Sequence, residues 1–223
     1  MKILAISDEV SPKFWDHYQK GCLWEYDLII SCGDLKAEYL SFLVTMARCP
    51  VLYVHGNHDD RYGYDPPLGC DCIEDKIVEF NGVKILGLGG SYRYHPGFCQ
   101  YTEKEMRQRI RRLRYQLWRA GGVDLVVTHA PIEGVGDGQD IAHKGFAAFR
   151  ELVEKYSPRY WLHGHMHLNY GQDKTRERML GCTRVINACG YVELEIPENV
   201  HDPFWHGRLR WRNGKPKFSD DCV

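Results

Sequence analysis

The clearest feature of the chain is a series of short, almost continuously apolar stretches, each followed by polar residues or glycine. Stretches of this length without polar alternation are typical of β-strands that are covered on both faces. We therefore predict buried strands at residues 2–7, 27–32, 51–55, 84–88, 124–128, 160–163 and 185–188.

Two stretches between these strands predict amphipathic helices. Thr102 and Glu105 have the spacing of a capping box, so a helix is expected to begin there. A second helix is expected at residues 145–156, ending before Ser157 and Pro158. Apolar residues recur along one side of each helix, at Met106, Ile110, Leu113 and Leu117 in the first and at Phe146, Phe149, Leu152 and Val153 in the second.

Strands that alternate with helices predict an α/β fold. No repeat, low-complexity tract or linker interrupts the pattern, and 223 residues suit one large domain, so we predict a single domain over residues 1–223. Residues 197–223 form a polar C-terminal extension of unknown role, with Trp205, Trp211 and a turn signal at Asn213-Gly214. The sequence leaves open whether this extension is a flap over a sheet or a dimer contact.

Composition narrows the class of protein. Hydrophobic residues make up 43% and charged residues 26% of the chain, as in ordinary soluble globular proteins. No stretch is long enough to span a bilayer and the short apolar start is no signal-peptide core, so a cytoplasmic location without a membrane partner is expected. The nine cysteines include no CxxC pair and fit reduced thiols better than a zinc finger or a disulfide framework.

Charge does not favour nucleic acid as a partner. The formal net charge is −1, which gives no overall attraction for a phosphate backbone. One basic element stands out, the first predicted helix, which is either a solvated face or a surface for phosphates. Its arginines are Arg107, Arg109, Arg111, Arg112 and Arg114.

Candidate chemistry lies where the predicted strands end. Ligands of open α/β sheets bind outside the carboxyl ends of strands, so side chains there converge although they are distant in sequence. Five strands end on Asp, Asn or His, whose oxygen and nitrogen donors suit Mn, Fe, Zn or Ni. Glycines precede three of these residues and are expected to supply unusual backbone angles. The strand-end residues are Asp8, Gly33-Asp34, Gly56-Asn57-His58-Asp59, His129 and Gly164-His165-Met166-His167. The histidines expected to be structural are His55, His95, His201 and His206.

These motifs, in this order and with Thr128 before His129, resemble those of the calcineurin-like metallophosphoesterase superfamily. The resemblance runs from Asp8 to His167 and is most specific in the GNHD and GHMH pair. It implies two mixed β-sheets packed face to face with helices outside, an αββα sandwich. It also implies a dinuclear metal centre at one sheet edge.

The resemblance implies a role for each strand-end residue. Asp34 bridges two divalent ions, with manganese the ion best suited to activity. The two ions share a hydroxide that attacks phosphorus. His58 protonates the leaving group, work for which imidazole is suited near neutral pH. Asp59 either orients His58 or caps the turn. The first ion is bound by Asp8 and His167, and the second by Asn57, His129 and His165.

One position departs from the family pattern. The first motif of the family is Asp-x-His, and here it reads Asp8-Glu9-Val10. Residues i and i+2 of extended chain face the same way, so Glu9 is expected to point away from the ion. Asp8, Asp34 and His167 then remain, and three ligands with an open position still make a catalytic site. We expect the first ion to be held more weakly than the second.

Two loops are expected to face the substrate. The polar stretch 136–145 follows His129, and its His143 either reaches the phosphate or a metal-bound water, or caps the next helix. The stretch 89–95 follows a strand, and its Arg93 is a candidate for binding the substrate phosphate. Asn57 is predicted to bind the substrate as well as the metal. Tyr92 or Tyr94 is a candidate for stacking on a base.

Three functions fit these observations. The first is a metal-dependent phosphoesterase that hydrolyses a phosphodiester or a small phosphomonoester, since Gly33-Asp34 continues as Leu35-Lys36 and lacks the GDxVDRG signature of phosphoprotein phosphatases. The second is a non-catalytic scaffold of the same fold that binds partner proteins, as in retromer. The third is a nuclease, which only the arginine-rich helix supports.

Overall fold

The computed structural model describes residues 1–167 and 175–197. Apart from Pro197, the predicted extension 197–223 therefore lies outside the described residues, and so do His201 and His206. The two-part division of the chain at residue 197 stays a prediction.

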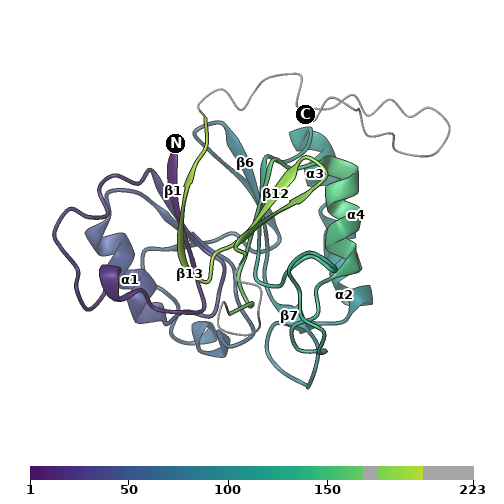
Figure 1. Cartoon of the computed structure of the whole chain (residues 1–223), viewed down its shortest axis with the longest axis horizontal. Coiled ribbons are helices and arrows are strands. Elements are labelled where there is room, and N and C mark those ends of the chain that lie inside the picture. The colour runs from purple at the N-terminus through teal and green to yellow at the C-terminus, as the bar shows by residue number, and fades with distance from the viewer. Residues whose placement is uncertain (168–174, 198–223) are drawn as a thin grey trace.

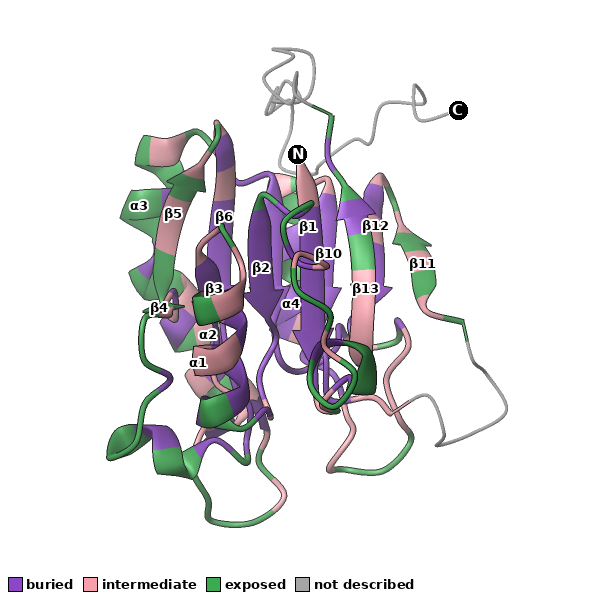
Figure 2. Ribbon diagram, turned by 90° about the vertical axis from the view of Figure 1, so that its left-hand side faces the viewer, coloured by how far each residue is buried: buried purple, intermediate pink, exposed green. Residues whose placement is uncertain are grey.

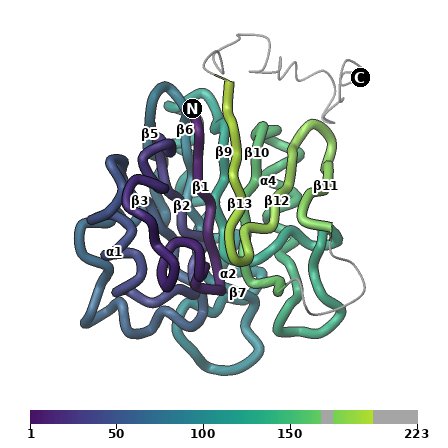
Figure 3. Tube along the Cα trace, turned by 60° about the vertical axis from the view of Figure 1, so that its left-hand side comes forward, coloured from purple at the N-terminus to yellow at the C-terminus, as the bar shows by residue number. Residues whose placement is uncertain are grey.

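Two mixed β-sheets form the centre of the molecule, side by side in Figure 1 and in the tube of Figure 3. The first has the order β13-β1-β2-β3-β4 and is parallel except for β13. Its strands are β1 (Lys2–Ser7), β2 (Leu28–Ser31), β3 (Val51–Tyr53), β4 (Asp71–Cys72) and β13 (Gly190–Glu195).

The second sheet has the order β11-β12-β10-β9-β6-β5, with antiparallel strands at both edges. Its strands are β5 (Lys76–Phe80), β6 (Val83–Leu88), β9 (Leu125–Thr128), β10 (Tyr160–His163), β11 (Glu177–Leu180) and β12 (Thr183–Asn187). A small ribbon pairs β7 (Ser91–Tyr92) with β8 (Gln100–Tyr101).

Helices cover the outer face of each sheet (Figure 1). On the first sheet lies α1 (Ala37–Met46). The short 3-10 turns η1 (Pro12–Phe14) and η2 (Asp60–Gly63) contribute Phe14 and Tyr62 to the same core. On the second sheet lie α2 (Glu103–Arg112), α3 (Arg114–Ala120) and α4 (Ala147–Tyr156). The αββα sandwich implied by the sequence is therefore confirmed.

Three apolar cores separate these layers, and they explain the unbroken apolar stretches of the sequence. Ile3 and Ala5 of β1 lie in the core between the sheets, while Leu4 and Ile6 lie in the core toward α1. Because both faces of the central strands are covered, alternate side chains enter different cores and neither face is polar (Figure 2).

The predicted strands are all found, with ends shifted by a few residues. Edge strands such as β5 and β11 were not predicted, because their residues alternate between exposed and half-buried and their apolar pattern is weak. The first predicted helix begins with the expected capping box at Thr102, but it divides at Leu113 into α2 and α3. The second begins at Ala147 and ends before the left-handed Ser157.

The arginine-rich face of α2 is only in part a solvated surface. Arg109 is buried, and its guanidinium lies 2.6 Å from Glu74 and 3.0 Å from Asp75. Arg107 pairs with Glu151 at 2.7 Å. These arginines therefore stabilise the packing of α2 on the protein. In the described residues no helix is long and apolar enough to cross a membrane.

We predict that Leu162→Ala destabilises the protein by about 2–5 kcal/mol, because truncation of a fully buried leucine leaves a cavity between the sheets. Urea unfolding followed by circular dichroism measures the change. Met179→Ala on β11 is the matched control, since that side chain is 64% exposed and its loss should cost less than about 0.5 kcal/mol. Equal losses in the two variants would contradict the position of the core.

Candidate metal centre

The strands β1, β2, β3, β9 and β10 send their following loops to one end of the sandwich, the lower edge in Figure 2. Three residues in these loops have left-handed backbone conformations: Asp8 with φ 62°, Asp34 with φ 57° and His165 with φ 66°. Such angles are costly for residues with a Cβ, and they cluster at functional sites. All three residues are predicted metal ligands. Unusual angles were expected at Gly33, Gly56 and Gly164, but of these only Gly33 has a positive φ, and the left-handed angles fall on the predicted ligands instead.

The glycines of these loops allow neighbouring loops to approach each other closely. Gly33 has φ 97°, and a Cβ there would meet the backbone of Gly56. A Cβ at Gly56 would in turn overlap the carboxylate of Asp34. The loops after β2 and β3 thus touch backbone to backbone, which only glycine permits.

Asp59 holds these two loops together. Its Oδ2 accepts the backbone N–H of Asp34 at 2.9 Å and that of Gly56 at 2.7 Å. Of the two roles considered for Asp59, the structure supports turn capping, extended across two loops. The buried Asp59 carboxyl has a pKa raised to about 6, chiefly by its burial.

Another hydrogen bond joins loops from the two different sheets. The carboxylate of Asp8, at the end of β1, accepts the backbone N–H of His165, after β10, at 2.9 Å and 3.1 Å. A Cβ at Gly164 would strike Ser7 and the Asp8 carboxylate, so this approach also depends on a glycine. Residues separated by most of the chain are therefore fixed at one point.

His129 is the most buried residue of the group, with no exposed surface. Its Nδ1 lies 2.8 Å from the backbone carbonyl of Cys32, and because a carbonyl only accepts, Nδ1 must carry the hydrogen. Nε2 faces the other way. It lies 3.2 Å from Asp34 Oδ2 and 3.1 Å from Asn57 Oδ1.

His165 is fixed in the same manner. Its Nε2 lies 2.7 Å from the carbonyl of Ala142, so Nε2 carries the hydrogen and Nδ1 presents its lone pair. That Nδ1 lies 3.1 Å from His129 Nε2. The amide of Asn57 is oriented by Nδ2, which donates to the Tyr94 hydroxyl at 3.3 Å.

Four acceptor atoms therefore meet at one point: Nε2 of His129, Nδ1 of His165, Oδ2 of Asp34 and Oδ1 of Asn57. At most one hydrogen, on His129 Nε2, is available to them. Burial would lower the pKa of His129, but the Asp34 carboxylate raises it above its ordinary value. Burial would raise the pKa of Asp34, and His129 lowers it instead. For His165, burial and the neighbouring His129 both lower the pKa, which keeps the ring neutral.

This donor set fits a divalent cation. Two imidazole nitrogens and two oxygens are a common set for first-row transition metals. Each imidazole has its other nitrogen bonded to a backbone carbonyl, as metal-ligating histidines usually do. Asp34, His129 and His165 also form one of the groups of described residues whose ligand atoms lie within 4.8 Å of one another.

His58 lies beside this cluster. Its backbone N–H donates to Asp34 Oδ1 at 2.8 Å, and the residue is exposed. The role of His58 as an acid stays a prediction.

The predicted first metal site differs from expectation. Glu9 was expected to point away, and this is wrong: its Oε1 lies 3.1 Å from His167 Nδ1. The reason is the turn at Asp8, where the N–H of Glu9 bonds to the Ser7 carbonyl at 2.6 Å and the extended chain ends. Val10 packs against the apolar core toward α1.

The two loop residues predicted to contact the substrate, His143 and Arg93, differ in position. The ring of His143 lies 5.3 Å from that of His165, and Asp140 holds its Nδ1 at 2.9 Å. His143 does not cap α4, because Glu103 accepts the N–H groups of Ala147 and Ala148. The guanidinium of Arg93 instead bonds to the Gln100 carbonyl and to Glu105 at 3.0 Å. Its role in binding phosphate stays an untested prediction.

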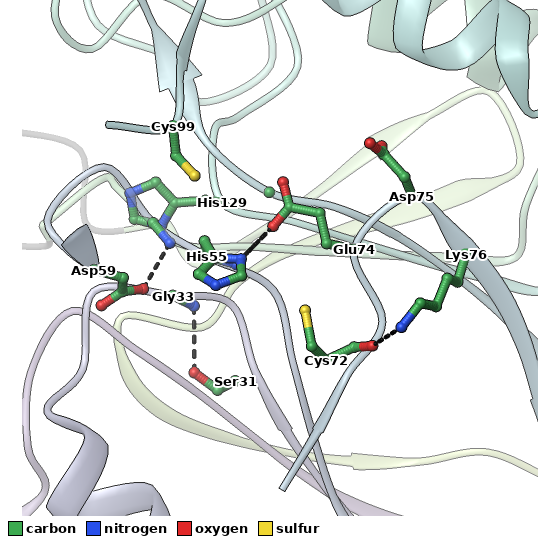
Figure 4. A network of polar contacts seen from close by, with 12 residues as sticks. Ser31, Gly33, His55, Asp59, Cys72, Glu74, Asp75, Lys76, Cys99 and His129 are labelled. Carbon is green, nitrogen blue, oxygen red and sulfur yellow. Dashed lines mark hydrogen bonds and ion pairs between the residues drawn. The ribbon is translucent and has the colours of Figure 1, made fainter. Parts of the chain in front are cut away.

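Of the two candidate stacking residues, Tyr94 lies at the site through its contact with Asn57, whereas Tyr92 packs on Phe146. His55 has the structural role expected of it: its Nδ1 lies 2.6 Å from Glu74, beside Cys72 (Figure 4). Burial would lower the pKa of His55, but Cys72 and Glu74 raise it to about 10.

One residue of this region was missed. Asn187, at the end of β12, donates from Nδ2 to the Met166 carbonyl at 2.6 Å and accepts the N–H of Cys189 at 2.9 Å. It thereby fixes the loop that carries His167. The strand was predicted to extend to residue 188, so Asn187 lay inside it and the search for polar residues directly after strands did not identify it.

The chain is similar to several known proteins. The sequence model of a family described as calcineurin-like phosphoesterase matches residues 1–169. The chain is 28% identical over 203 residues to the UPF0046 protein K07C11.7 of Caenorhabditis elegans, covering 77% of this chain and 65% of that protein. It is 25% identical over 200 residues to a lariat debranching enzyme of Drosophila pseudoobscura pseudoobscura, covering 65% of this chain and 37% of the enzyme. The chain thus spans less than two thirds of the length of these relatives.

A lariat debranching enzyme of Entamoeba histolytica is 23% identical over 215 residues, covering 78% of this chain and 56% of the enzyme. One solved crystal structure superposes with a TM-score of 0.64 at 16% identity, covering 86% of this chain and 94% of the other. That similarity concerns the fold.

We predict that Gly56→Ala weakens metal binding by about 10- to 100-fold, the loss typical of disturbing the surroundings of a metal ligand. The added methyl overlaps the Asp34 carboxylate and must displace it. Calorimetric titration with Mn²⁺ measures the affinity. Gly63→Ala is the matched control, because a Cβ there meets nothing within 4 Å. Unchanged affinity in a folded Gly56→Ala protein would contradict the placement of Asp34 in the site.

Proposed function

The chain belongs to the calcineurin-like phosphoesterase family, and from this premise we propose that it is a metal-dependent hydrolase of phosphate esters. The matching residues 1–169 include every residue predicted to bind metal. The observation that carries the proposal is the meeting of four acceptor atoms from Asp34, Asn57, His129 and His165 with at most one hydrogen among them.

Residues of both sites would hold two divalent ions, with Asp34 shared between them. Ions bound there would polarise the phosphate oxygens and supply an activated water for in-line attack. Manganese is the ion we propose for activity. Asn57 adds a neutral oxygen, so the centre gains a ligand without further negative charge. The backbone N–H of His58 steadies Asp34 Oδ1, which keeps the Asp34 carboxylate turned toward His129.

His58 is the residue we propose as the acid for the leaving group. It is exposed beside Asp34, and its neighbours Asn57 and Asp59 are buried and held by hydrogen bonds. The chain at His58 is therefore fixed while the imidazole is open to a substrate. His143, whose ring lies beside His165, is proposed to contact the substrate phosphate from the opposite loop.

The substrate class we propose is a phosphodiester or a small phosphomonoester. A nucleic-acid phosphodiester is the second candidate, favoured by the similarity to proteins named lariat debranching enzymes. The engagement of Arg107 and Arg109 in ion pairs weakens the case for α2 as a phosphate-binding surface. We therefore propose a small phosphodiester as the preferred substrate.

We predict hydrolysis of bis-p-nitrophenyl phosphate in the presence of Mn²⁺, and little hydrolysis after chelation. The same assay is run on p-nitrophenyl phosphate, single-stranded DNA and a branched oligonucleotide. Asp34→Asn should abolish turnover of all of them, since it removes the carboxylate shared by both ions. No turnover of any substrate by protein that carries both metals would overturn the enzyme proposal in favour of a scaffold. Preference for the oligonucleotides would replace the small phosphodiester with the nuclease.

We predict that His58→Ala lowers kcat about 10²- to 10⁴-fold, the usual contribution of general acid catalysis, while the metal content stays the same. Single-turnover rates and metal analysis of the same sample measure both. His17→Ala, which removes another exposed histidine, is the matched control. Full activity in His58→Ala would rule out its role as the acid.

A further inference from the structure

The first metal site lacks the histidine that the family pattern places at position 10. Val10 does not face the ion, because its side chain packs against the apolar core toward α1. Asp8 and His167 remain from the pattern, with Asp34 shared. The neighbourhood of His167, however, holds further groups able to bind a metal.

Glu9, His167 and Cys189 form a group whose ligand atoms all lie within 4.8 Å of one another. Glu9 Oε1 is 3.1 Å from His167 Nδ1. The Cys189 residue is buried with 2% exposure, whereas the side chains of Glu9 and His167 are 49% and 33% exposed. A thiol from the interior thus meets a carboxylate and an imidazole at the edge of the predicted centre.

The backbone brings these residues together from three segments. The turn at Asp8 directs Glu9 toward His167. Cys189 is bridged to Ser7, the residue before Asp8, where β13 begins to pair with β1.

Asn187 then joins the remaining two segments, donating to the Met166 carbonyl at 2.6 Å and accepting the Cys189 N–H at 2.9 Å. Its amide is buried, and both of its ends are used. The Asn187 side chain therefore fixes the segments of His167 and Cys189 relative to each other, as residues around a metal site commonly do for its ligands.

A surface ion pair is the simpler explanation for Glu9 and His167 alone. Exposed pairs of this kind contribute little to stability and need no third group. The sulfur of Cys189 is the observation that this explanation leaves out. Carboxylate, imidazole and thiolate in mutual reach are a set that binds Zn²⁺ or Co²⁺.

We propose that Glu9 and Cys189 are ligands of the first metal ion together with His167, replacing the imidazole that position 10 lacks. The inference rests on the proposed function, because it concerns the same dinuclear centre. A sulfur ligand gives the first site a preference for Zn²⁺ or Co²⁺ over Mn²⁺, while the nitrogen and oxygen ligands of the second site accept all three.

Titration of the metal-free protein with Co²⁺ tests the sulfur ligand directly. Thiolate bound to Co²⁺ gives a sulfur-to-metal charge-transfer band in the near ultraviolet, and binding by oxygen and nitrogen alone does not. We expect the band in the native protein and its loss in Cys189→Ser. Cys72→Ser is the matched control, since Cys72 lies in a separate group with His55 and Glu74 that also has metal-ligand geometry. A band that survives in Cys189→Ser and disappears in Cys72→Ser overturns the proposal.

Metal counting tests the carboxylate. We expect Glu9→Gln and Cys189→Ser each to weaken the first site roughly tenfold or more, so that dialysed protein retains one Zn²⁺ instead of two. Glu79→Gln, an exposed carboxylate on β5, should retain both. Two tightly bound ions in both Glu9→Gln and Cys189→Ser would overturn the proposal even if one of the variants were inactive.

These measurements separate the inference from the proposed function. A charge-transfer band that depends on Cys189, in a protein that hydrolyses no ester, refutes the enzyme and supports the metal site. Hydrolysis by the native protein, with no thiolate band at any Co²⁺ concentration, supports the enzyme and refutes the ligand role of Cys189.

Discussion

The hydrogen bond from His129 Nδ1 to the carbonyl of Cys32 is the interaction on which the candidate centre depends. It crosses from the second sheet to the first, because His129 follows β9 and Cys32 follows β2. It also determines which ring nitrogen can bind a metal, since it leaves only Nε2 to face Asp34 and Asn57. Because His129 is fully buried and its Nδ1 is bonded to Cys32, the fold directs Nε2 toward the cluster.

The two halves of the centre are built differently. The residues proposed for the second site are buried, and His129, His165 and Asn57 are each oriented by a further hydrogen bond. Among the residues proposed for the first site, Glu9 and His167 are partly exposed and Cys189 is buried. The left-handed turns at Asp8, Asp34 and His165 are held by hydrogen bonds to the carboxylates of Asp59 and Asp8 and by the close approach of glycines. This local strain is tolerated because several bonds determine each loop at once.

Much of this arrangement could be predicted from the sequence, because central strands and strand-end ligands leave strong local signals. Continuous apolar stretches such as residues 2–7 mark strands buried on both faces, and polar residues directly after them mark the site. Edge strands such as β11 leave weak signals, because one face is solvated and the pattern is short. The orientation of Glu9 was predicted wrongly, since extended-chain geometry does not anticipate a left-handed residue at Asp8. Nothing in the sequence indicated that Cys189 could be a ligand or that Asn187 fixes the loop of His167. Their proximity to His167 depends on tertiary pairing between β1 and β13.

Anomalous diffraction from crystals of the protein soaked in Mn²⁺ tests the central claim most directly, namely that the four acceptor atoms around His129 Nε2 form a cation site. The account predicts an anomalous peak bound by Nε2 of His129, Nδ1 of His165 and the side-chain oxygens of Asp34 and Asn57. It would be contradicted by a map with no ion at that point, in which His129 Nε2 keeps its contact with the Asp34 carboxylate at full Mn²⁺ concentration.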